Sequence, residues 1–235
     1  MNSRRRIVLA LFFASLLGAT VVRAGAGSPG KEALQELNDF IGGWKGNGTS
    51  ERDKRLIWKE NIDWSWRFQK GKEPSLMFAI DKGKYFKKGE LRFLPGKKVY
   101  ELTLVDVAGK SRVFEGVRKK GKLVLERSDG DGKEKQKLEM NLAGDGARLI
   151  YTYWVMPENR TLYGREFQVG YTKLGETFGS AAKKVECIVT GGLGTIKVTY
   201  KGADYYVCCS GCRDAFYETP EKFIKEYNAK KKGGK

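Results

Sequence analysis

The sequence predicts a mainly β protein, in which an antiparallel up-and-down barrel of about ten strands is followed by a small α+β module. Three observations predict this fold class. Strand-like runs separated by glycine turns fill residues 42–173. One of those runs alternates apolar and polar residues for 12 positions. All four cysteines lie after residue 186, which indicates one local purpose for them.

The predicted barrel spans 31–173 and begins with a helix over 31–41, where apolar residues recur at helical spacing until Gly42 and Gly43 end it. The clearest strand is 57–68, because period two over that length is typical of a strand with one buried face. Its predicted inner face carries Trp58, Glu60, Ile62, Trp64, Trp66 and Phe68. Further strand-like runs are 76–80, 90–94, 99–107, 112–118, 123–127, 135–142, 148–155 and 165–173. Short connectors favour antiparallel neighbours, and closure into a barrel removes exposed edges.

The segment 39–46, DFIGGWKG, resembles the opening of lipocalin and fatty-acid-binding-protein-like barrels. In that group a short helix leads to a glycine and a tryptophan that enters the first strand, so the resemblance implies that Trp44 plugs the closed end. The related nitrobindin-like barrels bind haem through a histidine. This chain contains no histidine, so haem binding is not carried over.

The barrel interior leaves two interpretations open. Trp58, Trp64 and Trp66 either fill the barrel, which we favour, or line a cavity for an apolar small molecule together with Glu60. A buried carboxylate needs a partner, and Arg165 or a polar ligand group are the candidates for Glu60.

The cysteines Cys187, Cys208 and Cys212 have the spacing C-x20-C-x3-C. We expect a short strand over 187–189, a hairpin through residues 195–207, a helical stretch over 214–218, and a final helix that begins near Pro220. A unit of this size needs a metal or disulfides to be stable. The linker before it is 174–184, and a basic tail over 229–235 is expected to be a frayed, solvated end.

Thiolates are soft donors that suit Zn²⁺ or Cu(I). Cys208 and Cys212 are one helical turn apart and can share an ion. Together with Cys187 they supply three ligands, which leaves a tetrahedral ion one ligand short. The fourth ligand is then Cys209, Asp214, water or a cargo group, and Cys209 is the weakest of the four cysteine candidates because adjacent cysteines seldom bind one ion.

Residues 200–212, YKGADYYVCCSGC, and their continuation through Phe216 and 220–223 resemble the TRASH and YHS domains over about 185–228. Those families have a treble-clef-like fold and are linked to heavy-metal sensing, trafficking and resistance. The resemblance implies that Cys187, Cys208 and Cys212 are metal ligands. Ile188 departs from the pattern, because many members have proline there.

Two alternatives to a metal site remain open. Export and an even number of cysteines favour disulfides. The spacing Cys209-x-x-Cys212 fits a redox pair, although no thioredoxin-like βαβ pattern accompanies it. The absence of histidine excludes Ser-His-Asp and Cys-His catalysis, and we expect a binding protein and no enzyme activity.

The first 26 residues have the pattern of a secretory signal peptide. Three arginines at 4–6 precede a 16-residue apolar run over 7–22 and the sequence Ala24-Gly25-Ala26. The run is short for a membrane span, so we expect cleavage and a periplasmic or secreted protein of bacterial type, with an uncleaved anchor as the alternative. Net charge is +17, and loss of four signal-segment arginines leaves about +13. The lysines are spread along the chain, which favours a solvated basic surface over nucleic-acid binding.

Overall fold

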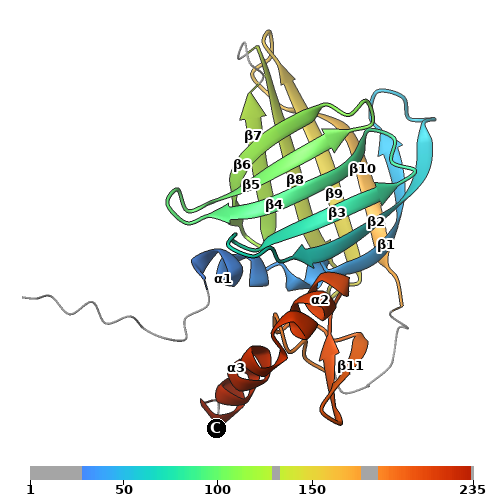
Figure 1. Cartoon of the computed structure of the whole chain (residues 1–235). Helices are drawn as coiled ribbons and strands as arrows, with labels where there is room; N and C mark the ends of the chain where they lie inside the picture. Colours follow the sequence, from blue (N-terminus) through green and yellow to red (C-terminus); the bar gives the residue numbers. More distant parts are fainter. Residues whose placement is uncertain (1–27, 129–132, 176–184, 234–235) are drawn as a thin grey trace, which may run out of the picture.

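The computed structural model describes residues 28–128, 133–175 and 185–233 (Figure 1). The predicted signal peptide over 1–26 and most of the predicted linker lie outside the described residues. Within the described part, the chain forms a closed antiparallel β-barrel and a small C-terminal region of one hairpin and two helices. This architecture confirms the predicted fold class.

The described barrel has ten strands in the order β1-β10-β9-β8-β7-β6-β5-β4-β3-β2, so every strand pairs with its chain neighbours and β1 pairs with β10. The strands are β1 Gly42–Ser50, β2 Ile57–Arg67, β3 Ser75–Asp81, β4 Phe86–Leu94, β5 Val99–Asp106, β6 Ser111–Lys119, β7 Lys122–Ser128, β8 Glu134–Ala143, β9 Arg148–Pro157 and β10 Gly164–Lys173. Strand β2 buries alternate residues, as its period-two pattern predicts.

The predicted helix over 31–41 divides into two pieces. Helix α1 is Pro29–Gln35, and a 3-10 turn, η1, follows at Asn38–Phe40. The helix begins earlier than predicted because the Ser28 hydroxyl accepts a hydrogen bond from the Lys31 backbone N–H at 3.2 Å and Pro29 fits the first turn.

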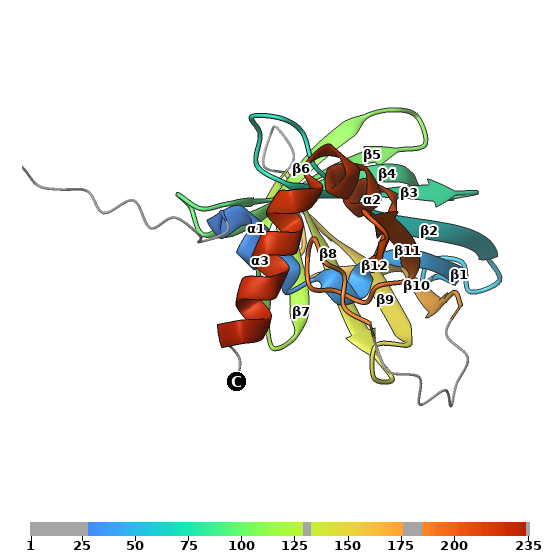
Figure 2. The same cartoon turned by 60° about the horizontal axis from the view of Figure 1, so that its bottom comes forward.

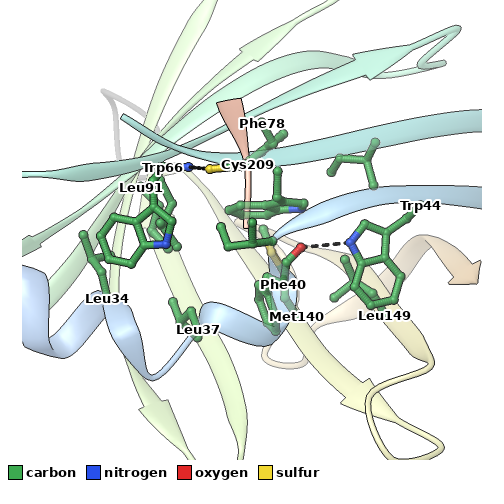
Figure 3. Close-up of a cluster of buried hydrophobic side chains, with 14 of the residues drawn as sticks. Leu34, Leu37, Phe40, Trp44, Trp66, Phe78, Leu91, Met140, Leu149 and Cys209 are labelled. Carbon is green, nitrogen blue, oxygen red and sulfur yellow. Dashed lines mark hydrogen bonds between the residues drawn. The ribbon is translucent and has the colours of Figure 1, made fainter. Parts of the chain in front are cut away.

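The two short helices cover one end of the barrel (Figures 1 and 2). Trp44 is fully buried there, and its indole N–H donates to the Phe40 carbonyl at 2.9 Å (Figure 3). Tyr100 joins a barrel strand to α1, because its hydroxyl donates to the Ala33 carbonyl at 2.9 Å. This geometry agrees with the closing role that the barrel resemblance implies for Trp44.

The C-terminal region comprises β11 Ile196–Tyr200, β12 Ala203–Val207, α2 Ser210–Glu218 and α3 Pro220–Gly233. It lies beside the closed end of the barrel (Figure 2). The strand expected over 187–189 is wrong: residues 188–190 form a turn, and Gly191 adopts a positive φ of 78° that such a turn requires. Residues 229–233, assigned from sequence to a basic tail, continue α3.

Helix α2 packs directly on the barrel. Gly211 lies so close to the Trp66 carbonyl on β2 that a Cβ atom at this position would overlap with the strand backbone. No helix among the described residues is long and apolar enough to cross a membrane.

Candidate metal centre

Three thiols converge between the hairpin and α2. Cys187 precedes the turn at 188–190, Cys208 follows β12, and Cys212 lies in the first turn of α2. Their Sγ atoms all lie within 4.8 Å of one another, and the Cys208 and Cys212 sulfurs are 3.4 Å apart. The three residues are 1%, 7% and 0% exposed. The structure therefore brings together the three ligands predicted from sequence.

Backbone hydrogen bonds hold the Cys187 segment against the hairpin. The Ile188 N–H donates to the Tyr206 carbonyl at 2.9 Å, and the Thr195 N–H donates to the Val207 carbonyl at 2.9 Å. Within the turn, the Gly191 N–H donates to the Cys187 carbonyl at 2.8 Å. These bonds close the long loop between the first and second cysteines, so residues far apart in sequence share one site.

The spacing of the sulfurs fits a soft metal ion. A tetrahedral Zn²⁺ with bonds of about 2.3 Å to sulfur separates its sulfur ligands by about 3.8 Å. The Cys208 and Cys212 sulfurs are 3.4 Å apart, all three sulfurs lie within 4.8 Å of one another, and burial shields them from water. The cluster could therefore hold a metal ion with little rearrangement.

Thr190 is part of the centre and was missed from the sequence. Its hydroxyl oxygen lies 3.4 Å from the Cys187 sulfur, 3.6 Å from the Cys208 sulfur and 4.0 Å from the Cys212 sulfur. It is only 2% exposed. A signal was present in the sequence, because Thr190 follows Cys187 with two residues between them. Two metal ligands in zinc-binding motifs often have this spacing, and here threonine stands at the second ligand position.

Cys209 lies beside the cluster, with its sulfur in contact with both Cys208 and the barrel backbone. Its sulfur accepts a hydrogen bond from the Trp66 backbone N–H at 3.4 Å (Figure 3), and it lies 3.9 Å from the Cys208 sulfur. Its thiol is buried between α2 and the barrel and is not one of the three grouped sulfurs. Asp214, another candidate for the fourth ligand, is exposed and accepts from Arg213 at 3.1 Å, so that candidate is wrong.

The four cysteines all carry free thiols in the described structure, which includes no disulfide among them. Hydrogen bonds from Cys208 and Cys212, helped by Thr190, lower the pKa of Cys187 to about 2. The neighbouring Cys187 raises the pKa of Cys208, and burial raises that of Cys212. Among the three grouped cysteines, Cys187 is therefore the thiolate in the absence of a cation, and hydrogen bonds from Cys208 and Cys212 also lower the pKa of the neighbouring Cys209 to about 3. A bound cation would be needed to hold all three grouped cysteines as thiolates.

Positive charge is available close to the sulfurs. The amino group of Lys31 interacts electrostatically with Cys212, although burial lowers the pKa of this lysine. Cys212 also lies in the first turn of α2, where a helix favours negative charge. Both features stabilise thiolates at this position.

Glu60 is satisfied inside the barrel by neutral donors. It is 5% exposed, and its carboxylate accepts from the Trp58 indole N–H at 2.7 Å and from the Tyr171 hydroxyl. Arg165, proposed from sequence as its partner, instead pairs with Glu51 on the outer surface. That pairing prediction was wrong because β10 turns Arg165 away from the interior.

Trp64 and Trp66 pack within the closed half of the barrel. Trp64 is 0% exposed and lies 5.6 Å and 4.4 Å, between ring centroids, from Phe40 and Phe78. Trp66 stacks on Phe68 at 5.6 Å. These contacts are what the filling interpretation predicts for the tryptophans.

A separate pocket of about 400 Å³ lies at the opposite, open end of the barrel. Its aromatic lining residues are Tyr85, Phe86, Tyr153 and Phe167. The ring of Tyr151 lies 5.7 Å from that of Phe167, and its buried hydroxyl has no hydrogen-bond partner among the described residues.

Comparison with known proteins adds little. No family model matches the chain, and no curated protein matches it. Among solved structures, the crystal structure of Rv2717c from M. tuberculosis matches 60% of this chain and 96% of its own, with 15% sequence identity and a TM-score of 0.38. The class of protein is thus defined by its own fold and site: a closed β-barrel protein with a buried cysteine cluster that could hold a metal ion.

Proposed function

We propose that this chain is an exported metal-binding protein, which holds Zn²⁺ or Cu(I) on Cys187, Cys208 and Cys212 and acts in metal handling. The observation that carries the proposal is the convergence of three buried thiols from separate elements, with sulfurs within 4.8 Å. The chemistry of the donors supports a soft ion over Mg²⁺ or Ca²⁺. The resemblance of residues 185–228 to TRASH and YHS domains supports metal handling.

Export is supported by the arginines at 4–6, the apolar run over 7–22 and the small residues that follow. In a periplasmic or extracellular setting, the cysteines meet an oxidising environment. A metal ion bound to the three thiolates would protect them from oxidation, because the free thiolate is the reactive species.

The decisive experiment is elemental analysis of the full chain purified under anaerobic conditions, together with its Cys208→Ser, Cys212→Ser and Cys209→Ser variants. We expect a single ion per chain in the wild type and in Cys209→Ser, and its loss in the other two. Intact mass with and without reductant counts disulfides in the same samples. Two disulfides and no metal in the wild type would overturn the proposal.

A second function is favoured by one observation, the aromatic pocket at the open end and the nearby Tyr151 hydroxyl, which has no partner within the part of the chain that the structure describes. A barrel that carries an apolar small molecule with one polar group would use both features. Native mass spectrometry of the purified chain tests this: a co-purifying organic molecule that remains in Cys208→Ser supports a carrier. A bare chain that also fails to bind a fluorescent apolar probe contradicts it.

A further inference from the structure

The geometry points to Thr190 as the fourth ligand of the centre, and to Zn²⁺ as the ion that the four ligands favour over Cu(I). This inference rests on the proposed function, since it specifies which ion the same site selects. It assigns a role to a residue outside the cysteine pattern.

The first support is the position of the hydroxyl oxygen. In a tetrahedral site with Zn–S bonds of about 2.3 Å and a Zn–O bond of about 2.1 Å, the oxygen lies about 3.6 Å from each sulfur. The Thr190 oxygen lies 3.4, 3.6 and 4.0 Å from the sulfurs of Cys187, Cys208 and Cys212. It therefore stands at the fourth vertex of a tetrahedron whose other vertices are the three sulfurs.

The second support is that the barrel fixes this position. The Thr190 carbonyl accepts hydrogen bonds from the Gln35 side chain at 2.8 Å and from the Asn38 side chain at 2.9 Å. Asn38 is itself fixed, because its side-chain oxygen accepts from the Trp66 indole N–H at 3.1 Å. The backbone of Thr190 is thus held at both α1 and η1, while its hydroxyl faces the sulfurs.

The third support is the match between donor set and ion. A threonine hydroxyl coordinates through an oxygen lone pair and keeps its proton, so three thiolates and Zn²⁺ leave a net charge of −1 beside Lys31. Zn²⁺ accepts oxygen ligands such as carboxylate and water beside sulfur, whereas Cu(I) is selected by sulfur and gains little from a hydroxyl. With all four vertices supplied by buried protein groups, no coordination position is open to a substrate, as in closed zinc sites that do not catalyse reactions.

The test uses the full chain and three substitutions at one position. Thr190→Val keeps the shape and removes the oxygen, Thr190→Ser keeps the hydroxyl, and Thr190→Cys replaces it by a fourth thiol. Zn²⁺ and Cu(I) affinities are measured by competition with chelators of known affinity. We expect Thr190→Val to lose Zn²⁺ affinity by about 10–100-fold with Cu(I) affinity nearly unchanged, Thr190→Ser to resemble the wild type, and Thr190→Cys to bind Zn²⁺ more tightly.

X-ray absorption on the zinc-loaded wild type gives a readout that does not depend on any variant folding. Three sulfurs and one oxygen are expected in the first shell, and four sulfurs in Thr190→Cys. Wild-type affinity for Zn²⁺ in Thr190→Val, or a first shell without oxygen in the wild type, would overturn the role of Thr190. Failure of the proposed function looks different, because then the wild type binds neither ion and Cys208→Ser changes nothing.

Discussion

Asn38 is the side chain that links the metal centre to the closed end of the barrel, and its replacement by alanine tests that link. Its amide group donates to the Thr190 carbonyl at 2.9 Å, and its oxygen accepts from the Trp66 indole N–H at 3.1 Å. Trp66 is 1% exposed, so its N–H has no access to bulk water once Asn38 is truncated.

The expected cost follows from these two bonds. A buried donor left unsatisfied costs about 1–3 kcal/mol, and the lost bond to Thr190 adds about 0.5–1.5 kcal/mol. Asn38→Ala should therefore reduce the free energy of unfolding by about 1.5–4.5 kcal/mol. Gln35→Ala is the matched control, because Gln35 donates to the same carbonyl but holds no tryptophan. It should cost only about 0.5–1.5 kcal/mol.

The assay is urea unfolding of both variants and the wild type without metal, followed by Zn²⁺ titration of each. Intrinsic tryptophan fluorescence, to which Trp66 contributes as one of five tryptophans, should also change in Asn38→Ala and remain as in the wild type in Gln35→Ala. We expect weaker Zn²⁺ binding in Asn38→Ala, because Thr190 is then held by Gln35 alone. Equal unfolding free energies for the two variants would refute the linking role of Asn38.

Three further predictions concern the cysteines and the barrel interior. Cys209→Ser should retain the metal, which elemental analysis measures, because its sulfur accepts from the Trp66 backbone N–H and is not one of the three grouped sulfurs. Loss of the metal would make Cys209 a ligand. Glu60→Ala should lower the free energy of unfolding by about 2–5 kcal/mol, measured in urea, since it removes the acceptor of two donors inside the barrel; a change below about 0.5 kcal/mol would contradict this. In metal-free protein, the lowered pKa of Cys187 means that its thiolate persists as pH falls and protonates only toward a pKa of about 2. Thiolate absorbance near 240 nm should therefore survive at about pH 5 and decrease in Cys187→Ser, with the remainder coming from Cys209, because hydrogen bonds from Cys208 and Cys212 lower the pKa of Cys209 to about 3. An ordinary thiol with a pKa near 8.5 would show none there.

The barrel was predictable because each strand repeats a simple pattern. Strand β2 alternates over its whole length, and its buried residues are those that the pattern places inward. The boundaries were less predictable: β4 begins at Phe86, earlier than its apolar run, because pairing with β5 extends it. Helix α1 is shorter than the apolar repeat in the sequence, because the last residues of that repeat form the 3-10 turn η1.

The metal centre was predictable only as far as its cysteines. Their spacing places three thiols in one unit, but nothing in the spacing shows which way each thiol points. The sulfur of Cys209 is directed at Trp66 by the docking of α2 on β2, which is a tertiary contact. Thr190 joined the centre because a turn replaced the expected strand at 187–189, and a strand would have turned its side chain differently. The partner of Glu60 was likewise not predictable, because Tyr171 comes from β10, a strand far from Glu60 in the sequence.

The most direct test of the central claim is the count of sulfur atoms around the metal in the full chain, purified anaerobically without added metal and examined by X-ray absorption. We predict a bound ion with three sulfur ligands at about 2.3 Å. A chain without metal whose cysteines are paired in two disulfides, or a bound ion with no more than one sulfur ligand, would contradict it.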